Sequence, residues 1–209
     1  MAGSMSEADL VDDLKRSLHD CAGVFNAPEN ADFVRFLKQA LPDMGWKRPR
    51  TLLGQVTLSV NEPRFSLVDL PDFHAYKMHV WQTGAYCPQA WEPGYAGALP
   101  RVGSHKDSAG YWLDFQPAPS AAHIALRGSA FKFYYFASHG ISTVGADTTV
   151  ALVDRPLLLL RAQAEAMLEL TLRNAAKPVQ LRDGLSGTPR NSTPAALHAT
   201  LLAMFAEAH

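Results

Sequence analysis

The sequence predicts an α+β protein in which both chain ends form a small antiparallel helical bundle and a β-rich segment is inserted between them. Apolar residues recur at helical spacing in residues 1–50 and 151–209. Across residues 51–150, aromatic and β-branched residues instead alternate with polar ones. We therefore expect a bundle formed by residues 1–50 and 151–209, with residues 51–150 as a β-rich insertion and not as a separate domain on a linker.

The N-terminal part predicts two amphipathic helices. Ser6, with Asp9 three residues later, has the pattern of a capping box. The first helix carries an apolar stripe and is expected to stop near Gly23; the stripe is Leu10, Leu14, Leu18 and Cys21. A second helix is predicted over residues 29–41, and Pro42 is expected to end it. Its apolar face is Phe33, Phe36, Leu37, Ala40 and Leu41.

The middle of the chain predicts strands. In residues 56–67 (VTLSVNEPRFSL), apolar and polar residues alternate on both sides of Asn61-Glu62-Pro63, which predicts a β-hairpin. Further strands are predicted at 73–81, 111–116, 122–127 and 130–137. Residues 82–110 are rich in Gly and Pro and are read as one long loop, a length that is uncommon in a compact domain unless the loop has a function.

The C-terminal part predicts the other two helices. Asp154-Arg155-Pro156 suits a helix start, and the helix is expected to end near Lys177-Pro178. Its apolar face is Leu157, Leu160, Ala164, Met167, Leu168 and Leu172, and its charged stripe is Arg161, Glu165, Glu169 and Arg173. Thr193-Pro194 opens a last helix, whose apolar face is Leu197, Leu201, Met204 and Phe205.

The amino-acid composition argues against several classes of function. The 209 residues are 47% hydrophobic and carry 19 basic and 20 acidic side chains, which argues against a molecule devoted to nucleic-acid binding. Residues 46–50 (WKRPR) are either a basic contact patch or, as we favour, a solvated joint. No apolar run approaches the roughly 20 residues of a membrane helix, and the first residues do not resemble a signal peptide. Cys21 and Cys87 have no metal-ligand spacing, so we expect reduced structural thiols and no cofactor.

No catalytic motif stands out among the eight histidines. Ser104-His105-Lys106-Asp107 contains the residue types of a triad, but adjacent side chains seldom point toward one another. His139 follows a predicted strand, where a turn is expected. We predict no enzyme, no catalytic residue and no metal site. The alternative is a small hydrolase or lyase that uses His105 or His139 with a nearby carboxylate.

Aromatic residues in the long loop suggest a contact surface. Tyr86, Trp91 and Tyr95 stand among prolines and glycines. Such residues anchor protein interfaces or stack on sugars, which keeps a carbohydrate-binding module as a further alternative. They would otherwise fold back over the sheet as a lid.

Four segments together resemble the head-to-tail adaptor (connector) proteins of tailed bacteriophages. These are T-L-x-V-N-E-x-R-F-x-L at 57–67, D-L-P-D-F at 69–73, L-D-F-Q-P-A-P at 113–119 and the helix R-P-L-L-L-L-R-A-Q-A-E-A-M-L-E-L at 155–170. The similarity is one of layout and extends from about residue 8 to 208. Residues 82–110 have no counterpart in it.

The resemblance implies a virion structural protein at the head–tail interface, assembled in the cytoplasm of the bacterial host. Such proteins form a ring, typically of about twelve copies, that binds the portal and the tail or nozzle protein and lengthens the channel for passing double-stranded DNA. The C-terminal helix, with Met204, Phe205 and His209, is then expected to contact the portal. The remaining partner contacts expected are Tyr86, Trp91, Tyr95, Phe65, Arg161 and Glu165.

Overall fold

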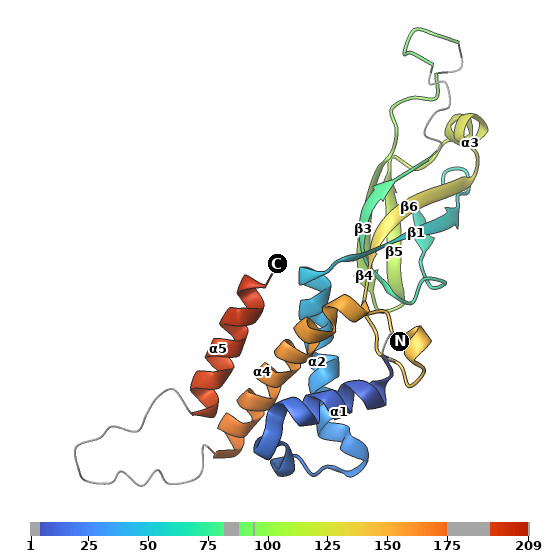
Figure 1. Ribbon diagram of the computed structural model, residues 1–209. Helices are drawn as coiled ribbons and strands as arrows, with labels where there is room; N and C mark the ends of the chain where they lie inside the picture. Colours follow the sequence, from blue (N-terminus) through green and yellow to red (C-terminus); the bar gives the residue numbers. More distant parts are fainter. Residues whose placement is uncertain (1–4, 82–87, 94, 175–192, 209) are drawn as a thin grey trace, which may run out of the picture. The chain divides into compact units, whose positions relative to one another are not determined.

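The protein is mixed helix and sheet. The computed structural model describes residues 5–81, 88–93, 95–174 and 193–208, which contain five α-helices and two three-stranded antiparallel sheets (Figure 1). The chain divides into two compact units. The helical unit is Met1–Arg48 with His139–His209, and the β unit is Pro49–Ser138. The fold is therefore α+β.

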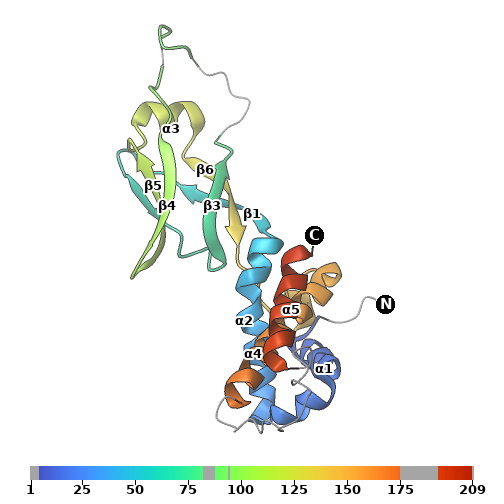
Figure 2. The same ribbon diagram turned by 90° about the vertical axis from the view of Figure 1, so that its left-hand side faces the viewer.

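The helical unit contains α1 (Glu7–Leu18), α2 (Ala31–Lys47), α4 (Arg155–Asn174) and α5 (Pro194–Glu207). Short 3₁₀ turns at His19–Val24, Pro28–Asn30, Gly145–Asp147 and Leu152–Asp154 complete it. One hydrophobic core contains side chains from all four α-helices. Both views draw α5 alongside α4, with the end of α4 and the start of α5 at the same end of the unit (Figures 1 and 2).

Helix α1 begins as its sequence predicts and ends earlier. The Ser6 hydroxyl oxygen accepts a hydrogen bond from the Asp9 backbone N–H at 3.3 Å. Leu10 and Leu14 are fully buried on the predicted face. The α-helix stops at Leu18 because His19 adopts a positive φ of 49°, and a 3₁₀ turn follows. Cys21, predicted on the buried face, is exposed for that reason.

Helix α2 continues past Pro42, and the prediction that it ends there was wrong. Proline removes one helical hydrogen bond and crowds the preceding turn, which normally disfavours a helix interior. Here the last turn contributes to the core: Met44 is fully buried and its carbonyl accepts a hydrogen bond from the Arg48 N–H at 2.7 Å. Tertiary packing of this turn outweighs the local preference.

The β unit consists of two sheets and one helix. The first sheet has the order β1–β6–β3, from Arg50–Thr57, Ala130–Ala137 and Phe73–His79. The second has the order β2–β5–β4, from Arg64–Ser66, Gly110–Gln116 and Arg101–Asp107. Helix α3 spans Ala121–Arg127. The core of this unit is aromatic and combines side chains of both sheets, among them Phe73, Phe115, Phe131 and Phe133.

Residues 56–67 do not form a hairpin, which corrects the sequence prediction. Strand β1 pairs with β6, whereas β2 pairs with β5 in the other sheet. Leu58 and Leu67, which flank the intervening turn, are both buried in the core of the β unit. The turn itself is tied to a distant segment, because the Asn61 N–H donates to the Pro119 carbonyl at 2.8 Å. Apolar and polar residues therefore alternate as predicted, but the two halves of the segment belong to strands of different sheets.

Two other predictions in the middle of the chain were also wrong. Residues 122–127 form α3 instead of a strand, because Ser120 and His123 make a reciprocal capping box that starts a helix. The predicted loop 82–110 contains β4, which pairs along its whole length with β5. Strand β3 forms as predicted, but two irregularities in its pairing with β6 interrupt its alternation.

Candidate interaction surfaces

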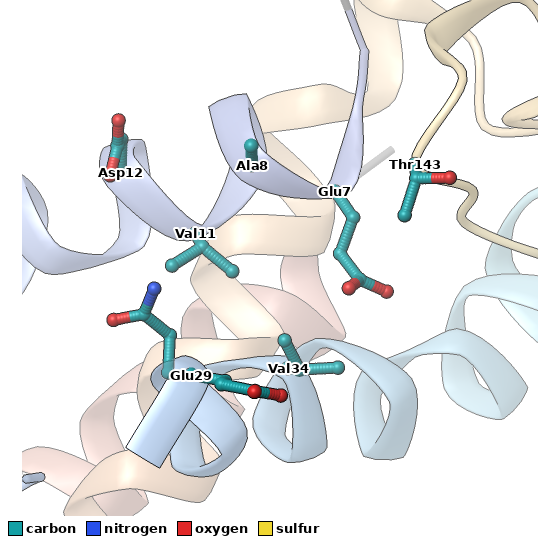
Figure 3. A pocket seen from close by; sticks show the side chains of 8 residues that line it. Glu7, Ala8, Val11, Asp12, Glu29, Val34 and Thr143 are labelled. Carbon is teal, nitrogen blue, oxygen red and sulfur yellow. The ribbon is translucent and has the colours of Figure 1, made fainter. Parts of the chain in front are cut away.

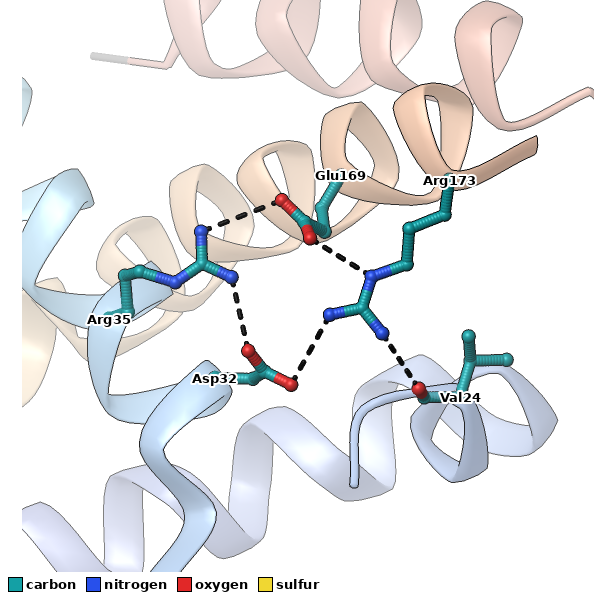
Figure 4. Close-up of polar contacts among 5 residues, drawn as sticks. All are labelled: Val24, Asp32, Arg35, Glu169 and Arg173. Atoms are coloured by element: carbon teal, nitrogen blue, oxygen red, sulfur yellow. Dashed lines mark hydrogen bonds and ion pairs between the residues drawn. The ribbon is translucent and has the colours of Figure 1, made fainter. Parts of the chain in front are cut away.

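The charged stripe of α4 faces α2 (Figure 4). Arg173 donates hydrogen bonds to Glu169 at 2.9 Å, to Asp32 of α2 at 3.4 Å and to the Val24 carbonyl at 3.0 Å. Arg35 of α2 completes the network, bonding Asp32 at 3.1 Å and Glu169 at 3.5 Å. The hydrogen bond to Glu169 is the largest of the effects that raise the pKa of Arg173. These side chains join two helices of one chain.

Arg161 and Glu165, predicted as contacts between subunits, are paired within the chain. The Arg161 guanidinium contacts Glu165 at 2.5 Å and Asp43 of α2 at 2.6 Å. Both Arg161 and Glu165 are largely buried. An additional role toward a neighbouring subunit would have to compete with these ion pairs.

Helices α4 and α5 leave several apolar side chains exposed. Leu168 and Leu172 were predicted on the buried face of α4, but both are exposed. The core side of α4 contains Leu157 and Met167, as predicted, together with Leu158, Ala162 and Ala166. Leu197 and Met204, which lie seven residues apart on α5, are exposed as well. We call Leu168, Leu172, Leu197 and Met204 the α4–α5 surface.

Helix α5 is capped at its N-terminal end and held against the helical unit near its C-terminal end. Its N-terminal end is capped by Thr193, whose hydroxyl accepts from the Ala196 N–H at 3.2 Å. Near its C-terminal end, Phe205 is buried in the core of the helical unit. The Lys47 ammonium lies 5.9 Å from the centroid of the Phe205 ring and donates to the Ala208 carbonyl at 3.2 Å. Of the predicted portal contacts, Met204 is therefore accessible, Phe205 holds the helix in place, and His209 lies outside the described residues.

The aromatic residues predicted as contacts in the β unit also include both exposed and packed side chains. Trp91 is 80% exposed and so does not act as a lid over the sheet. Tyr95 is exposed too, and Tyr86 lies outside the described residues. Phe65 is half-buried and packs edge-to-face on Phe115, with ring centroids 5.4 Å apart.

Sequence reasoning missed an apolar row on the first sheet. The register aligns Leu53 of β1 and Met78 of β3 with Tyr134 of the central strand β6. Their exposed fractions are 55%, 52% and 37%, so all three side chains lie on the solvent-facing side of the sheet. The period-two pattern marks each residue as outward-facing, but only the strand pairing brings the three together.

The two histidines considered for catalysis have different surroundings. On the second sheet, His105 Nδ1 contacts the Asp114 carboxylate, which also accepts from Arg64 at 3.1 Å. His139 uses both ring nitrogens within the helical unit: Nε2 lies 2.7 Å from the Arg48 carbonyl and Nδ1 lies 3.4 Å from the Thr149 hydroxyl. His139 is thus a structural residue, whereas His105 has an orienting carboxylate.

A third histidine is held beside a tyrosine inside the β unit. Tyr76 and His79 share a hydrogen bond of 2.8 Å between the phenol oxygen and Nδ1. Burial, and secondarily Arg127, lowers the pKa of His79, and burial raises the pKa of Tyr76 to about 12. The neutral forms are favoured for both groups.

A pocket of about 210 Å³ lies between α1 and α2 (Figure 3). Ala8, Val11 and Val34 give it an apolar wall, and Glu7, Asp12 and Glu29 bring carboxylates to it. Glu7 pairs with Lys38 at 3.7 Å. Within the described ranges, neither Asp12 nor Glu29 forms an ion pair. The pocket is consequently acidic with an apolar wall.

In the part of the chain that the structure describes, no three His, Cys, Asp or Glu side chains gather closely enough to hold a metal ion. None of the helices described there combines the length and apolar character needed to cross a lipid bilayer.

Comparison of the chain with protein-family models and with curated proteins finds no match.

Proposed function

We propose that this chain is a non-enzymatic virion structural protein, the subunit of an adaptor ring that connects the portal of a tailed bacteriophage to its tail and extends the DNA channel. The α4–α5 surface carries this proposal. The resemblance in layout to head-to-tail adaptors suggests that the partner is the portal protein.

Helix α5 is the observation of greatest weight. Its 14 residues include a single Asp, Glu, Lys or Arg, which is Glu207, and a single buried side chain, Phe205. Exposed apolar patches of this kind mark interaction sites, because each Å² removed from water contributes roughly 25 cal/mol. A helix so poor in charge gains stability when a partner covers it.

The helical unit fits the bundle expected of an adaptor. α1, α2, α4 and α5 share one core, and we take them as a small antiparallel bundle that presents α5 on its outer side. Phe205 and Lys47 hold the helix against its own unit, which leaves Leu197 and Met204 for the portal. The exposed Trp91 of the β unit is then available to a neighbouring copy or to the tail protein.

Binding to the portal tests the proposal. Portal rings of the parent phage are mixed with the chain and sedimented, and the bound fraction is measured. We expect saturable binding that decreases at least about tenfold in Leu197→Asp and Met204→Asp, since each inserts a charge into an apolar contact. Ala199→Asp, at an exposed position on the other side of α5, is the matched control and should bind normally.

Failure to bind portal rings at any concentration would reject the proposal. Equal binding by Met204→Asp and the wild type would show that α5 does not contact the portal. Light scattering of the dilute isolated chain is a weaker test, because the contacts between adaptor copies that a portal template favours are sparsely populated at low concentration.

The contact between His105 and Asp114 favours a second candidate, a small hydrolase or lyase. A carboxylate that orients a histidine is one element of general acid–base catalysis. This candidate predicts turnover of an ester or amide library that is lost in His105→Ala and kept in His139→Ala. The adaptor proposal predicts no turnover by either.

A further inference from the structure

We propose that the outward face of the β1–β6–β3 sheet docks onto the acidic α1–α2 pocket of a second copy of this chain. The inference rests on the proposed ring assembly and specifies one of its contacts. It assigns a partner to two surfaces that the portal contact leaves unused.

The sheet face is apolar where an antiparallel sheet normally meets water with polar residues. Leu53, Tyr134 and Met78 form a continuous cross-strand row on it. Phe136, two residues after Tyr134 on the same side of β6, extends the row and lies under the Lys77 ammonium at 5.1 Å. Aromatic and aliphatic side chains in such a cluster are typical of protein interfaces.

The same face is positively charged. Lys77 and Lys132 are both exposed, and no Asp or Glu occurs in any of the three strands. Neither lysine forms an ion pair in the described part of the chain. Any partner that covers the row must bring carboxylates to these two ammonium groups, because a buried unpaired charge is costly.

The α1–α2 pocket has the complementary character. Asp12 and Glu29 are exposed carboxylates without an ion-pair partner in the described ranges. Val11 of α1 and Val34 of α2 line the pocket with apolar surface, and the Glu29 side chain lies beside Val34 (Figure 3). Two carboxylates without ion pairs in the described ranges, at a pocket with an apolar wall, match two lysines without ion pairs there beside an apolar row; of these, Lys77 donates to the Thr51 hydroxyl at 3.3 Å.

These surfaces differ from each other, and in the proposed ring the sheet face of each copy meets the pocket of the next, which is a heterologous contact. Such head-to-tail contacts close into a ring when the rotation between copies permits. A second copy of this chain is therefore the partner that satisfies both surfaces at once.

Zero-length cross-linking between isotopically labelled copies tests this contact without any portal. Equal amounts of ¹⁴N and ¹⁵N protein are mixed at high concentration and coupled with a carbodiimide, which joins lysine directly to carboxylate. We expect mixed-isotope peptides that link Lys77 or Lys132 to Asp12 or Glu29. Lys106, exposed on β4 of the other sheet, is the matched control and should give none.

Charge-reversal variants provide a second test of this contact between copies. Lys77→Glu with Lys132→Glu should lower the yield of mixed-isotope dimers at least about tenfold, and so should Asp12→Lys with Glu29→Lys. Combining all four substitutions in one chain should restore the yield, whereas Lys106→Glu should leave it unchanged.

Three results would overturn the inference: links found only within single-isotope peptides, no links at these residues, or no recovery in the fourfold variant. Loss of binding to single-stranded DNA in the lysine variants, with cross-linking unchanged, would assign the sheet face to nucleic acid. Because no portal is present, each result is independent of whether the chain binds one.

Discussion

The Lys47 ammonium lies over the ring of Phe205, 5.9 Å from its centroid, and so ties the end of α2 to the end of α5. The same ammonium donates to the Ala206 and Ala208 carbonyls, where the negative end of the helix dipole attracts a cation. Helix α5 is thus fixed at its C-terminal end although most of its surface is uncovered. This arrangement supports the proposal that α5 is held rigidly for a partner.

Phe205→Ala should destabilise the helical unit by about 3 kcal/mol, because it removes a buried aromatic ring and leaves a cavity beside Lys47. The free energy of unfolding from urea titration checks this. Met204→Ala, at the neighbouring but exposed position, should change it by less than about 0.5 kcal/mol. Equal effects of the two substitutions would show that Phe205 does not anchor α5.

Asp32→Ala should lower the free energy of unfolding by about 1 to 2 kcal/mol, because it removes one of the two carboxylates that Arg35 and Arg173 share and leaves them Glu169. The loss should shrink in high salt, which screens such partly exposed pairs. Asp69→Ala, at an exposed carboxylate in the β unit, is the control and should be neutral. A neutral Asp32→Ala would mean that the network in Figure 4 contributes nothing to stability.

Gly54→Ala should destabilise the β unit by about 1 to 3 kcal/mol through overpacking. A Cβ atom at this position would lie 2.9 Å from Phe133 Cζ and 3.0 Å from Leu70 Cδ1. At Gly103 of β4 the same substitution meets no atom within 4 Å, so Gly103→Ala should be tolerated. Thermal unfolding of the two variants distinguishes them, and similar midpoints would contradict the packing described here.

Stability should fall as pH rises above 10. Burial raises the pKa values of Tyr76 and Tyr135 from the ordinary 10.0 to about 12. Between pH 10 and about 12, these two phenols have lost their protons in the unfolded chain but keep them in the folded chain. The free energy of unfolding therefore decreases as the pH rises. Absorbance titration of tyrosinate should show late ionisation of Tyr76 and Tyr135.

Substituting the two tyrosines singly tests the assignment. Tyr76→Phe and Tyr135→Phe should each flatten the decline in stability above pH 10, because each removes a phenol whose pKa burial raises. An unchanged slope in both buried-site variants would place the late ionisations elsewhere.

Local signals in the sequence predicted where α1 and α5 begin. Ser6 and Thr193 cap their helices as expected, since a cap depends on residues within one turn. Long-range pairing was not accessible in this way. Strand β1 pairs with β6, which lies far along the chain, so the apparent hairpin at 56–67 was assigned to the wrong partner. Met44 shows the same limit, because its burial keeps α2 helical beyond Pro42.

The predicted contact residues also show what local sequence can and cannot predict. Exposure of Trp91 and Met204 agrees with a contact role, whereas Phe205 and Phe65 pack inside their own units. Apolar character alone does not distinguish a core residue from an interface residue. The row of Leu53, Tyr134 and Met78 depends on register across three strands, which no short sequence pattern encodes.

Electron microscopy of the chain mixed with portal rings of a tailed bacteriophage images the proposed contact itself. We expect a ring of copies on the tail-facing end of the portal, with α5 of each copy against the portal surface. Portal rings that remain bare under saturating concentrations of the chain, or copies attached with α5 turned toward solvent, would contradict it.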